Sequence, residues 1–489
     1  MYKSTRETEK LKVISSSQAI IKGIASDGGL FICDKLPHVD LLELVGANYH
    51  QLAKKIMELL LDDFSATEIS EIVDQAYDSK FDTFGIVRLV ATKKCHFLEL
   101  FHGQTLAFKD MALSILPLLL AKAKIKNKIS DKTIILTATS GDTGSAALSG
   151  FYKQKDIDVI VFYPNSGVSQ IQEQQMLSFQ GANSHVIAIN GNFDDAQRLV
   201  KRAFNDEKLQ HYPLSSANSI NIGRLIPQVV YYFYGYLELV RTKQISFGEQ
   251  VNFVVPTGNF GNILAGYMAK KMGVPIRKLI CASNENNVLT EFFQEGMYDC
   301  NRPFIKTSSP SMDILISSNL ERLLYYISGC DARKVKDLMM QLSTKGKYQI
   351  DEVMRAELQD FYANFASETE MKEAIVDVYQ KDHYLIDTHT AVAVAVYEKY
   401  RQETDDQTKT IITSTAHPFK FSRAICQALQ MDIKGSSDWE FIQALSSKTK
   451  NAIPKVLTCL NKEQKRNLWS KEESYAHLEK LLGDLYEKN

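Results

Sequence analysis

The segment LFHGQTLAFKDMAL, residues 100–113, is the part of this sequence on which both the architecture and the chemistry depend. It places Lys109 among apolar neighbours at the start of a predicted helix. Apolar surroundings disfavour the ammonium form of a lysine, so its amine becomes available as a nucleophile toward a carbonyl compound. The alternative is an ordinary surface lysine before a helix, and the rest of the chain must decide between the two.

From about residue 96 onward, short β-branched runs alternate with helical segments. The predicted strands are residues 133–137, 158–163, 185–189, 252–255, 278–282 and 410–413. Near-continuous apolar strands separated by helices indicate parallel sheets covered on both faces, which bind ligands at the carboxyl ends of their strands. The sequence therefore predicts an α/β fold with its ligand site at strand ends.

Two glycine-rich turns each follow a predicted strand and precede a helix. In the first, TATSGDTGSAA (residues 137–147), Ser/Thr hydroxyls and helix N-terminal N–H groups can hold an anion such as a carboxylate. The alternative there is a plain strand-to-helix turn with an Asp or Ser cap. In the second, VVPTGNFGNILAG (residues 254–266), consecutive N–H groups can form a nest for a phosphate monoester. It lacks both the P-loop lysine and the G-x-G-x-x-G pattern, which favours a small phosphorylated cofactor over a nucleotide.

Size and composition limit the possible classes of protein. The 489 residues are 45% hydrophobic and 24% charged, as in a globular protein of two or three domains. The net charge of −1 argues against a nucleic-acid partner. No apolar run of about 18 residues and no secretory signal occurs, so we expect a cytoplasmic protein without a membrane contact. Scattered cysteines and histidines indicate reduced thiols and no metal site.

Several segments together resemble threonine synthases of the longer bacterial and fungal class, which are fold-type II pyridoxal-phosphate enzymes. The motifs that carry the resemblance are residues 102–110, 139–144 and 258–262, supported by residues 27–30, 218–224, 309–314 and 414–421. They span most of the chain in the right order. Gln104 replaces the proline that the family usually has after His-Gly, and we expect this to change loop stiffness more than chemistry.

The resemblance implies a tryptophan synthase β-like α/β fold with parallel-sheet domains. We expect residues 1–95 to form a small N-terminal domain, in which we find no chemistry-bearing group. Residues 96–489 would form the catalytic region, with 121–240 as a smaller subdomain inside it. We expect the tail from about residue 462 to be a solvated amphipathic helix.

The cofactor implied by the resemblance is pyridoxal 5'-phosphate, attached covalently to Lys109. Its phosphate would bind in the nest, which is formed by Gly258, Asn259, Phe260 and Asn262. Thr415 would face the pyridine nitrogen, where a neutral hydroxyl moderates the electron-sink strength of the ring. Without the resemblance, Thr415 would be interpreted as an ordinary strand-end threonine.

The implied reaction converts O-phospho-L-homoserine and water into L-threonine and phosphate, the last step of threonine biosynthesis, with Lys109 as general base. The expected substrate-binding residues are Thr139, Ser140, Asp142 and Thr143 in the first turn, and Asn218, Ser219 and Arg224 for the leaving phosphate. The alternative for Arg224 is a salt bridge at a helix start. Many relatives have Asn in place of Asp142, and we expect this carboxylate to contact the substrate amine or a turn N–H.

Two other functions stay open from the sequence. One is a lyase that only eliminates phosphate from a phosphorylated hydroxyamino acid. The other is a catalytically dead binding protein on the same scaffold, against which the intact Lys109 and both turns argue. The resemblance favours a monomer.

Overall fold

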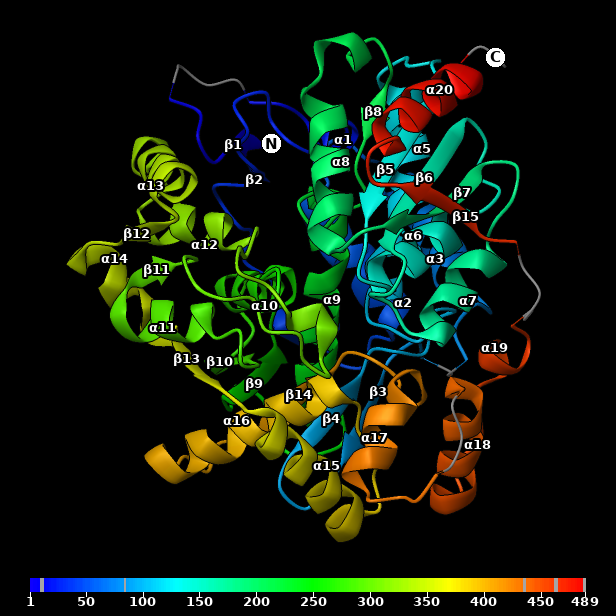
Figure 1. Cartoon of the computed structure of the whole chain (residues 1–489). Helices are drawn as coiled ribbons and strands as arrows, with labels where there is room; N and C mark the ends of the chain where they lie inside the picture. Colours follow the sequence, from blue (N-terminus) through cyan, green and yellow to red (C-terminus); the bar gives the residue numbers. More distant parts are fainter. Residues whose placement is uncertain (9–12, 83–84, 434–436, 461–464, 487–489) are drawn as a thin grey trace.

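The computed structural model of the chain describes residues 1–8, 13–82, 85–433, 437–460 and 465–486. Two mainly parallel sheets, each covered by helices, form the body of the molecule (Figure 1). All six predicted strands are strands, and the predicted α/β class with parallel sheets is confirmed. All seven cysteines are free thiols, as predicted.

The larger sheet has six strands in the order β13-β10-β9-β14-β4-β3. These strands are β3 (Arg88–Ala91), β4 (His96–Glu99), β9 (Val251–Pro256), β10 (Ile276–Ser283), β13 (Phe361–Phe365) and β14 (Thr410–Ser414). All neighbours pair in parallel except β3 and β4, which are antiparallel. Every residue of β9 and β14 is buried, because helices cover both faces of the central strands.

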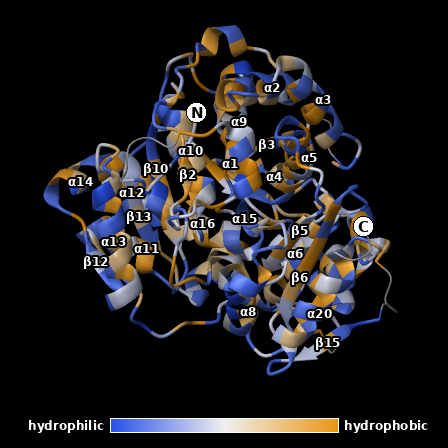
Figure 2. Ribbon diagram, turned by 90° about the horizontal axis from the view of Figure 1, so that it is seen from above, coloured by the Kyte–Doolittle hydropathy of each residue, from blue (hydrophilic) through white to orange (hydrophobic). Residues whose placement is uncertain are grey.

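The second sheet has five parallel strands in the order β15-β7-β6-β5-β8. These strands are β5 (Thr133–Ala138), β6 (Ile157–Pro164), β7 (Ser184–Asn190), β8 (Leu214–Ser215) and β15 (Asn467–Ser470). Hydrophobic residues run along β5 and β6 in Figure 2, as expected for strands covered on both faces.

The amphipathic helix predicted for the tail is present as α20 (Ser474–Tyr486), but the expectation that the tail is solvated is wrong. β15 pairs with β7, and α20 buries Tyr475, Leu478, Leu482 and Leu485 in a core shared with α8 (Phe193–Asn205). These four residues lie at the spacing of one helix face, so the helix docks by its apolar stripe and exposes its charged side chains. The start of the predicted tail, residues 462–464, lies outside the described residues.

The N-terminal region is mainly helical. Ser65 caps α3 in a capping box with Glu68. A short strand, β2 (Phe31–Ile32), pairs antiparallel with β1 (Lys3–Ser4). The helices of this region are α1 (Ser16–Lys22), α2 (Tyr49–Leu60) and α3 (Ala66–Ala76), with the 3-10 helix η1 (Leu41–Leu44).

The remaining elements cover and connect the two sheets. The helices are α4 (Asp110–Leu113), α5 (Leu116–Lys126), α6 (Asp142–Phe151), α7 (Gln170–Ser178), α8 (Phe193–Asn205), α9 (Ile222–Arg241), α10 (Gly261–Lys271), α11 (Val288–Glu295), α12 (Leu320–Ile327), α13 (Ala332–Lys345), α14 (Glu352–Ala356), α15 (Glu368–Asp382), α16 (Thr388–Thr404), α17 (Ser422–Ala428), α18 (Asp438–Thr449) and α19 (Lys455–Thr458). The short elements are η2 (Glu207–Leu209), η3 (Pro310–Met312), η4 (Glu357–Asp360), η5 (Pro418–Phe421), β11 (Met297–Asp299) and β12 (Lys347–Gln349).

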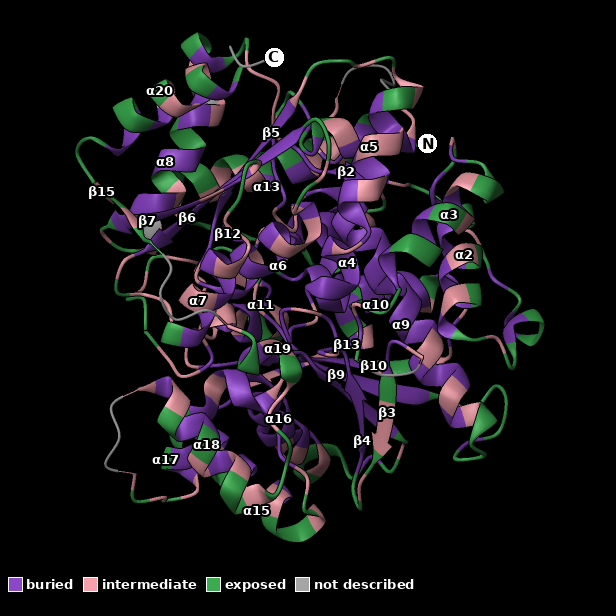
Figure 3. Cartoon of the chain, turned by 90° about the vertical axis from the view of Figure 1, so that its right-hand side faces the viewer, coloured by how far each residue is buried: buried purple, intermediate pink, exposed green. Residues whose placement is uncertain are grey.

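The helix α9 lies at the centre of the molecule and is buried over most of its length. It packs against α2, α4 and α10. It therefore joins the N-terminal region to α4, which follows Lys109, and to α10, which follows the second glycine-rich turn. Figure 3 shows the same distribution, with burial concentrated on α9 and α10 and exposure on the outer faces of α2, α3 and α20. None of the helices in the described part of the chain is long and apolar enough to cross a membrane.

Candidate active site

A cavity of about 1060 Å³ lies where the carboxyl ends of β5, β9 and β14 face one another. The turns that follow these three strands form much of its wall, as expected for a parallel α/β sheet. The structure brings every residue of the predicted site to this wall, namely Lys109, Thr139, Ser140, Asp142, Thr143, Asn218, Ser219, Arg224, Gly258, Asn259, Phe260, Asn262 and Thr415.

Lys109 is buried directly before α4 and lines the cavity. Its Nζ lies 3.4 Å from Asp142 Oδ2 and 3.4 Å from Ser311 Oγ. Burial lowers the pKa of Lys109; Asp142 opposes this shift, and the positive charge of Lys420 adds to it. A lowered pKa makes the neutral amine easier to form, which a nucleophile or a general base needs.

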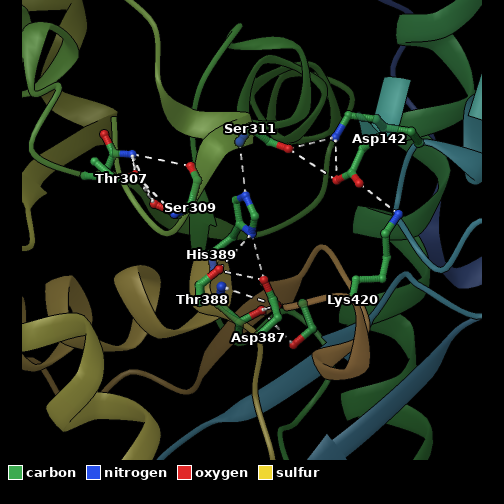
Figure 4. Close-up of polar contacts among 12 residues, drawn as sticks. Asp142, Thr307, Ser309, Ser311, Asp387, Thr388, His389 and Lys420 are labelled. Atoms are coloured by element: carbon green, nitrogen blue, oxygen red, sulfur yellow. Dashed lines mark hydrogen bonds and ion pairs between the residues drawn. The ribbon is translucent and has the colours of Figure 1, made fainter. Parts of the chain in front are cut away.

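Asp142 is the first residue of α6 and forms the centre of a buried charge cluster (Figure 4). Its Oδ1 lies 2.8 Å from Lys420 Nζ and accepts a hydrogen bond of 2.9 Å from Gln172. Its Oδ2 accepts the Ser311 hydroxyl at 3.2 Å. Although burial raises it, the positive charges of Lys420 and Lys109 hold the pKa of Asp142 well below its usual range. Asp142 is therefore a carboxylate, and it orients the Lys109 amine.

Lys420 was not among the residues predicted for the site. Its side chain is fully buried, and its Nζ also donates to the carbonyl oxygen of Thr105 at 2.7 Å. Lys420 lies in residues 414–421, one of the segments that resemble threonine synthases, but only the folded chain places it against Asp142. Gln172 and Ser311 reach the same carboxylate from α7 and η3.

The second glycine-rich turn leads directly into α10. Phe260 has a left-handed backbone conformation with φ of 64° just before the helix begins. The carbonyl oxygens of Gly258 and Asn259 are held by the Ser317 hydroxyl at 2.7 Å and by the Asn319 amide at 2.9 Å. The first N–H groups of a helix have no partner inside it, so they remain available to an anion in the cavity.

Gly258 is required at its position by a close approach. A Cβ atom there would lie 2.5 Å from the carbonyl oxygen of Ser311, which real Cβ atoms essentially never do. The second turn therefore packs directly against the segment that also contacts Lys109. Ser311 therefore contacts both Lys109 and the second glycine-rich turn.

Two buried donors at the cavity wall have no partner among the described residues. Asn262 accepts the hydroxyls of Tyr231 and Tyr232 at its Oδ1, which leaves its Nδ2 unpaired. Arg224 donates from Nη1 to the carbonyl oxygen of Ala217 at 2.9 Å, and its Nε is unpaired. Burial lowers the pKa of Arg224 to about 10, and the buried group still carries its charge at neutral pH.

The salt bridge considered for Arg224 does not form within the described part of the chain. No carboxylate of those residues lies within ion-pair distance of its guanidinium, as the ion pairs of the structure show. Burying a guanidinium without a counter-charge is costly, so an anion in the cavity would stabilise Arg224.

The remaining predicted residues contribute in different ways. The Thr139 hydroxyl oxygen accepts the N–H groups of Gly141 and Gly144, both at 2.9 Å, so much of its capacity stabilises the turn itself. Ser219 accepts a hydrogen bond from Asn319 at 3.2 Å. The carbonyl oxygen of Thr415 accepts the Phe108 N–H at 2.8 Å, which ties the end of β14 to the segment carrying Lys109.

The N-terminal region also reaches the cavity, although we found no chemistry-bearing group in it. Its contribution is the end of α1 and the following turn, namely Lys22, Gly23, Ile24, Ala25, Ser26 and Gly28. The sequence signal was the segment of residues 27–30, which supports the family resemblance but does not by itself indicate a place at the cavity.

Comparison with known proteins agrees with this geometry. Residues 93–415 match the family "Pyridoxal-phosphate dependent enzyme", residues 1–77 match "Threonine synthase N terminus" and residues 390–480 match "Threonine synthase, C-terminal". Threonine synthase from Saccharomyces cerevisiae is 36% identical over 95% of this chain and 94% of its own length. The chain belongs to the threonine synthase family.

Further relatives of this family give the extent of the similarity. The human protein "Threonine synthase-like 1" is 40% identical over 94% of this chain, but this chain spans only 63% of that relative's length. The crystal structure of yeast threonine synthase matches with a TM-score of 0.88 at 36% identity, over 99% of both chains. The pyridoxal-phosphate-bound enzyme from Brucella melitensis matches with a TM-score of 0.85 at 35% identity, over 98% of both chains. The predicted family and fold class are confirmed.

Proposed function

We propose that this chain is a threonine synthase, a pyridoxal-phosphate-dependent carbon–oxygen lyase that converts O-phospho-L-homoserine and water into L-threonine and phosphate. One observation carries the proposal most directly. One cavity, in a chain of the threonine synthase family, is lined by three features: a buried lysine with a lowered pKa, the start of a helix that has no acidic residue in its first turn, and a buried arginine whose Nε has no partner among the described residues.

The residues present fit the cofactor. Lys109 would hold it covalently, and the N–H groups of the turn at Gly258, Asn259 and Phe260, with the unpaired Nδ2 of Asn262, would hold its phosphate. Thr415 would face the ring nitrogen from the end of β14. When bound, pyridoxal phosphate supplies an electron sink for the negative charge that develops beside the amino group of the substrate.

The base in this mechanism is the Lys109 amine. As a free amine it would remove protons at Cα and Cβ, return one at Cγ and, once water has added at Cβ, return one at Cα. Asp142 and Ser311, each 3.4 Å from the amine, keep it oriented. Lys420 satisfies the other oxygen of Asp142, so the carboxylate does not compete for the proton that Lys109 must carry.

The substrate phosphate is assigned to Arg224, with Asn218 and Ser219 as neighbouring polar groups. A guanidinium can bind a phosphate bidentately, and burial strengthens the attraction. Breaking the Cγ–O bond releases phosphate to this arginine. Water then adds at Cβ, so the hydroxyl of threonine comes from water and the methyl hydrogen from Lys109. The first-turn residues Thr139, Ser140 and Thr143 would face the substrate carboxylate.

We also propose a refined division of the chain. Residues 1–95 would form the N-terminal domain and 96–489 the catalytic region. The smaller subdomain of residues 121–240 would include residues 467–486, because β15 extends its sheet and α20 packs on its helix α8.

Product analysis tests the function. The purified holoenzyme should form equal amounts of threonine and phosphate from O-phospho-L-homoserine, measured by chiral amino-acid analysis and a phosphate assay on the same samples. Phosphate with 2-oxobutanoate and no threonine would identify a simple lyase. A protein that binds the cofactor but releases no phosphate would contradict any catalytic assignment.

A further inference from the structure

The segment of residues 309–313, here called the serine turn, touches both halves of the proposed site. Ser311 Oγ lies 3.4 Å from Lys109 Nζ and 3.2 Å from Asp142 Oδ2. The carbonyl oxygen of the same residue occupies the space beside Gly258, where a Cβ would lie 2.5 Å away. A displacement of the serine turn would therefore disturb the amine and the phosphate nest together.

A histidine from a distant helix holds this turn. The backbone N–H of Ser311 donates to His389 Nε2 at 3.2 Å, as Figure 4 shows. A backbone N–H can only donate, so Nε2 must be the unprotonated ring nitrogen. The ring proton then lies on Nδ1 and is donated to Asp387 Oδ1 at 2.9 Å. Asp387 thus selects the tautomer that can accept from Ser311.

The surroundings of this pair are buried. Asp387 is 1% exposed and His389 2% exposed, and the imidazole packs edge-on against Phe421 with ring centroids 4.8 Å apart. Burial shields both hydrogen bonds from water and limits the rotation of the ring. The position of the acceptor nitrogen is therefore set by the packing at the start of α16.

A purely structural explanation accounts for only part of these contacts. Asp387 caps α16 by accepting the N–H of His389 at 2.8 Å, and it also accepts the Thr390 hydroxyl. A cap needs no imidazole. The second ring nitrogen reaches across to a segment 78 residues earlier in the chain, and that segment contacts Lys109.

The serine turn has a second support, which makes the question testable. Asn284, directly after β10, donates to Thr307, Ser309 and Asp313 at 2.9, 3.0 and 2.7 Å. These bonds hold the turn from the side facing the larger sheet. They do not involve Ser311, whose side chain contacts Lys109 and Asp142 and whose backbone N–H is held by His389.

We propose that His389, oriented by Asp387, is a positioning residue that keeps Ser311 against Lys109 and Gly258. The inference rests on the proposed function for its kinetic consequence. His389 also lines the cavity, but both of its ring nitrogens are engaged by Ser311 and Asp387, so we assign its effect to the position of Ser311. The two ends of the imidazole can be separated by substitution, because a Gln amide reaches the position of Nε2 and an Asn amide only that of Nδ1.

The test compares His389→Asn, which keeps the contact with Asp387, with His389→Gln, which keeps the contact with Ser311. Hydrogen exchange of residues 309–313 in the cofactor-free protein should accelerate on the order of tenfold in the Asn variant and stay within about threefold in the Gln variant. The dissociation constant of pyridoxal phosphate should rise in the Asn variant, and kcat should fall more than KM changes. Thr390→Val, which weakens the same cap without touching the ring, is the control and should leave exchange in the serine turn unchanged.

Several outcomes would overturn the inference. Equal hydrogen-exchange rates of the serine turn in the Asn and Gln variants would show that Asn284, and not His389, holds the turn. An equal acceleration in the Thr390→Val control would show that His389 acts only through the cap of α16. If the Asn variant does not fold, ¹⁵N NMR of the imidazoles of the unaltered protein decides, with His389 assigned from the Gln variant: a proton on Nε2 contradicts the proposal. Hydrogen exchange and NMR need no substrate, so failure of the proposed reaction would leave these readouts valid.

Discussion

The two glycine-rich turns share one pattern in sequence and differ in electrostatics. Each joins a buried parallel strand to a helix, β5 to α6 and β9 to α10. The first turn begins its helix with Asp142, so the chain itself supplies the negative charge that a helix N-terminus favours. The second turn has no acidic residue in its first helical turn, and its N–H groups remain for an external anion. The same backbone motif therefore contacts an amine on one side and, in the proposed function, would bind a phosphate on the other.

The comparison teaches that a glycine-rich turn does not by itself identify an anion site. Thr139 and Asp142 occupy much of the hydrogen-bonding capacity of the first turn. In the second turn, Ser317 and Asn319 hold the carbonyl oxygens, and the Asn262 Nδ2 is left unpaired. What distinguishes the two is which polar groups remain without a protein partner.

The largest expected effect is at the amine of Lys109, which Asp142 of the first turn contacts. Lys109→Ala should lower threonine formation to less than about 10⁻³ of the parent rate, because it removes the covalent anchor and the base together. Circular dichroism should show an intact fold, since the second turn and the core are unchanged. Borohydride reduction followed by peptide mapping should place the pyridoxyl group of the parent on Lys109, and a different labelled lysine would contradict the assignment.

The next effect separates the phosphate of the substrate from that of the cofactor. Arg224→Ala should lower kcat/KM for O-phospho-L-homoserine by roughly 30- to 1000-fold, the equivalent of about 2 to 4 kcal/mol. The absorption spectrum of the bound cofactor should be nearly unchanged, because the second turn holds that phosphate. Arg224→Lys should rescue only part, since it restores charge without the planar fork. Kinetics of the alanine variant within about threefold of the parent would exclude Arg224 as the clamp.

A milder change tests the second turn itself. Gly258→Ala should weaken pyridoxal-phosphate binding by roughly 5- to 150-fold, because overpacking against the Ser311 carbonyl costs about 1 to 3 kcal/mol. Gly261→Ala is the matched control in the same turn, since its Cβ would meet only side-chain atoms, Asn319 Nδ2 at 3.4 Å and Ser219 Cβ at 3.8 Å. Equilibrium dialysis measures both affinities. Similar losses in the two variants would remove the basis for assigning the phosphate to a close approach at Gly258.

The smallest effect concerns the pH dependence of stability that Asp142 confers on the first turn. Its pKa is held below the value of about 3.9 expected for the unfolded chain, so its contribution is present above that pH and is lost as the pH falls through the lower folded pKa. The free energy of unfolding of Asp142→Asn should therefore fall less steeply on acidification than that of the parent. Urea unfolding of the cofactor-free proteins between pH 3 and 7 measures the slopes, and identical slopes would contradict the ionised pair.

The segments that could be predicted were those in which short-range patterns decide the outcome. The strands at 133–138 and 251–256 follow from continuous apolar, β-branched residues, and Ser65 with Glu68 marks the start of α3 locally. The chain end could not be predicted in the same way. Its apolar residues are spaced for a helix face, but nothing nearby indicates that β15 would join β7, nearly 280 residues earlier.

The sequence by itself determined the alternation of strands and helices, the two turns and the lysine that precedes them, because each depends on neighbours a few residues away. Only the tertiary structure decided which charges meet. Ser311 lies 169 residues from Asp142 along the chain, Lys420 lies 315 residues from Thr105, and His389 lies 78 residues from Ser311. Their effect depends on burial and on distances of about 3 Å, which exist only when the parallel strands bring their carboxyl ends to one edge.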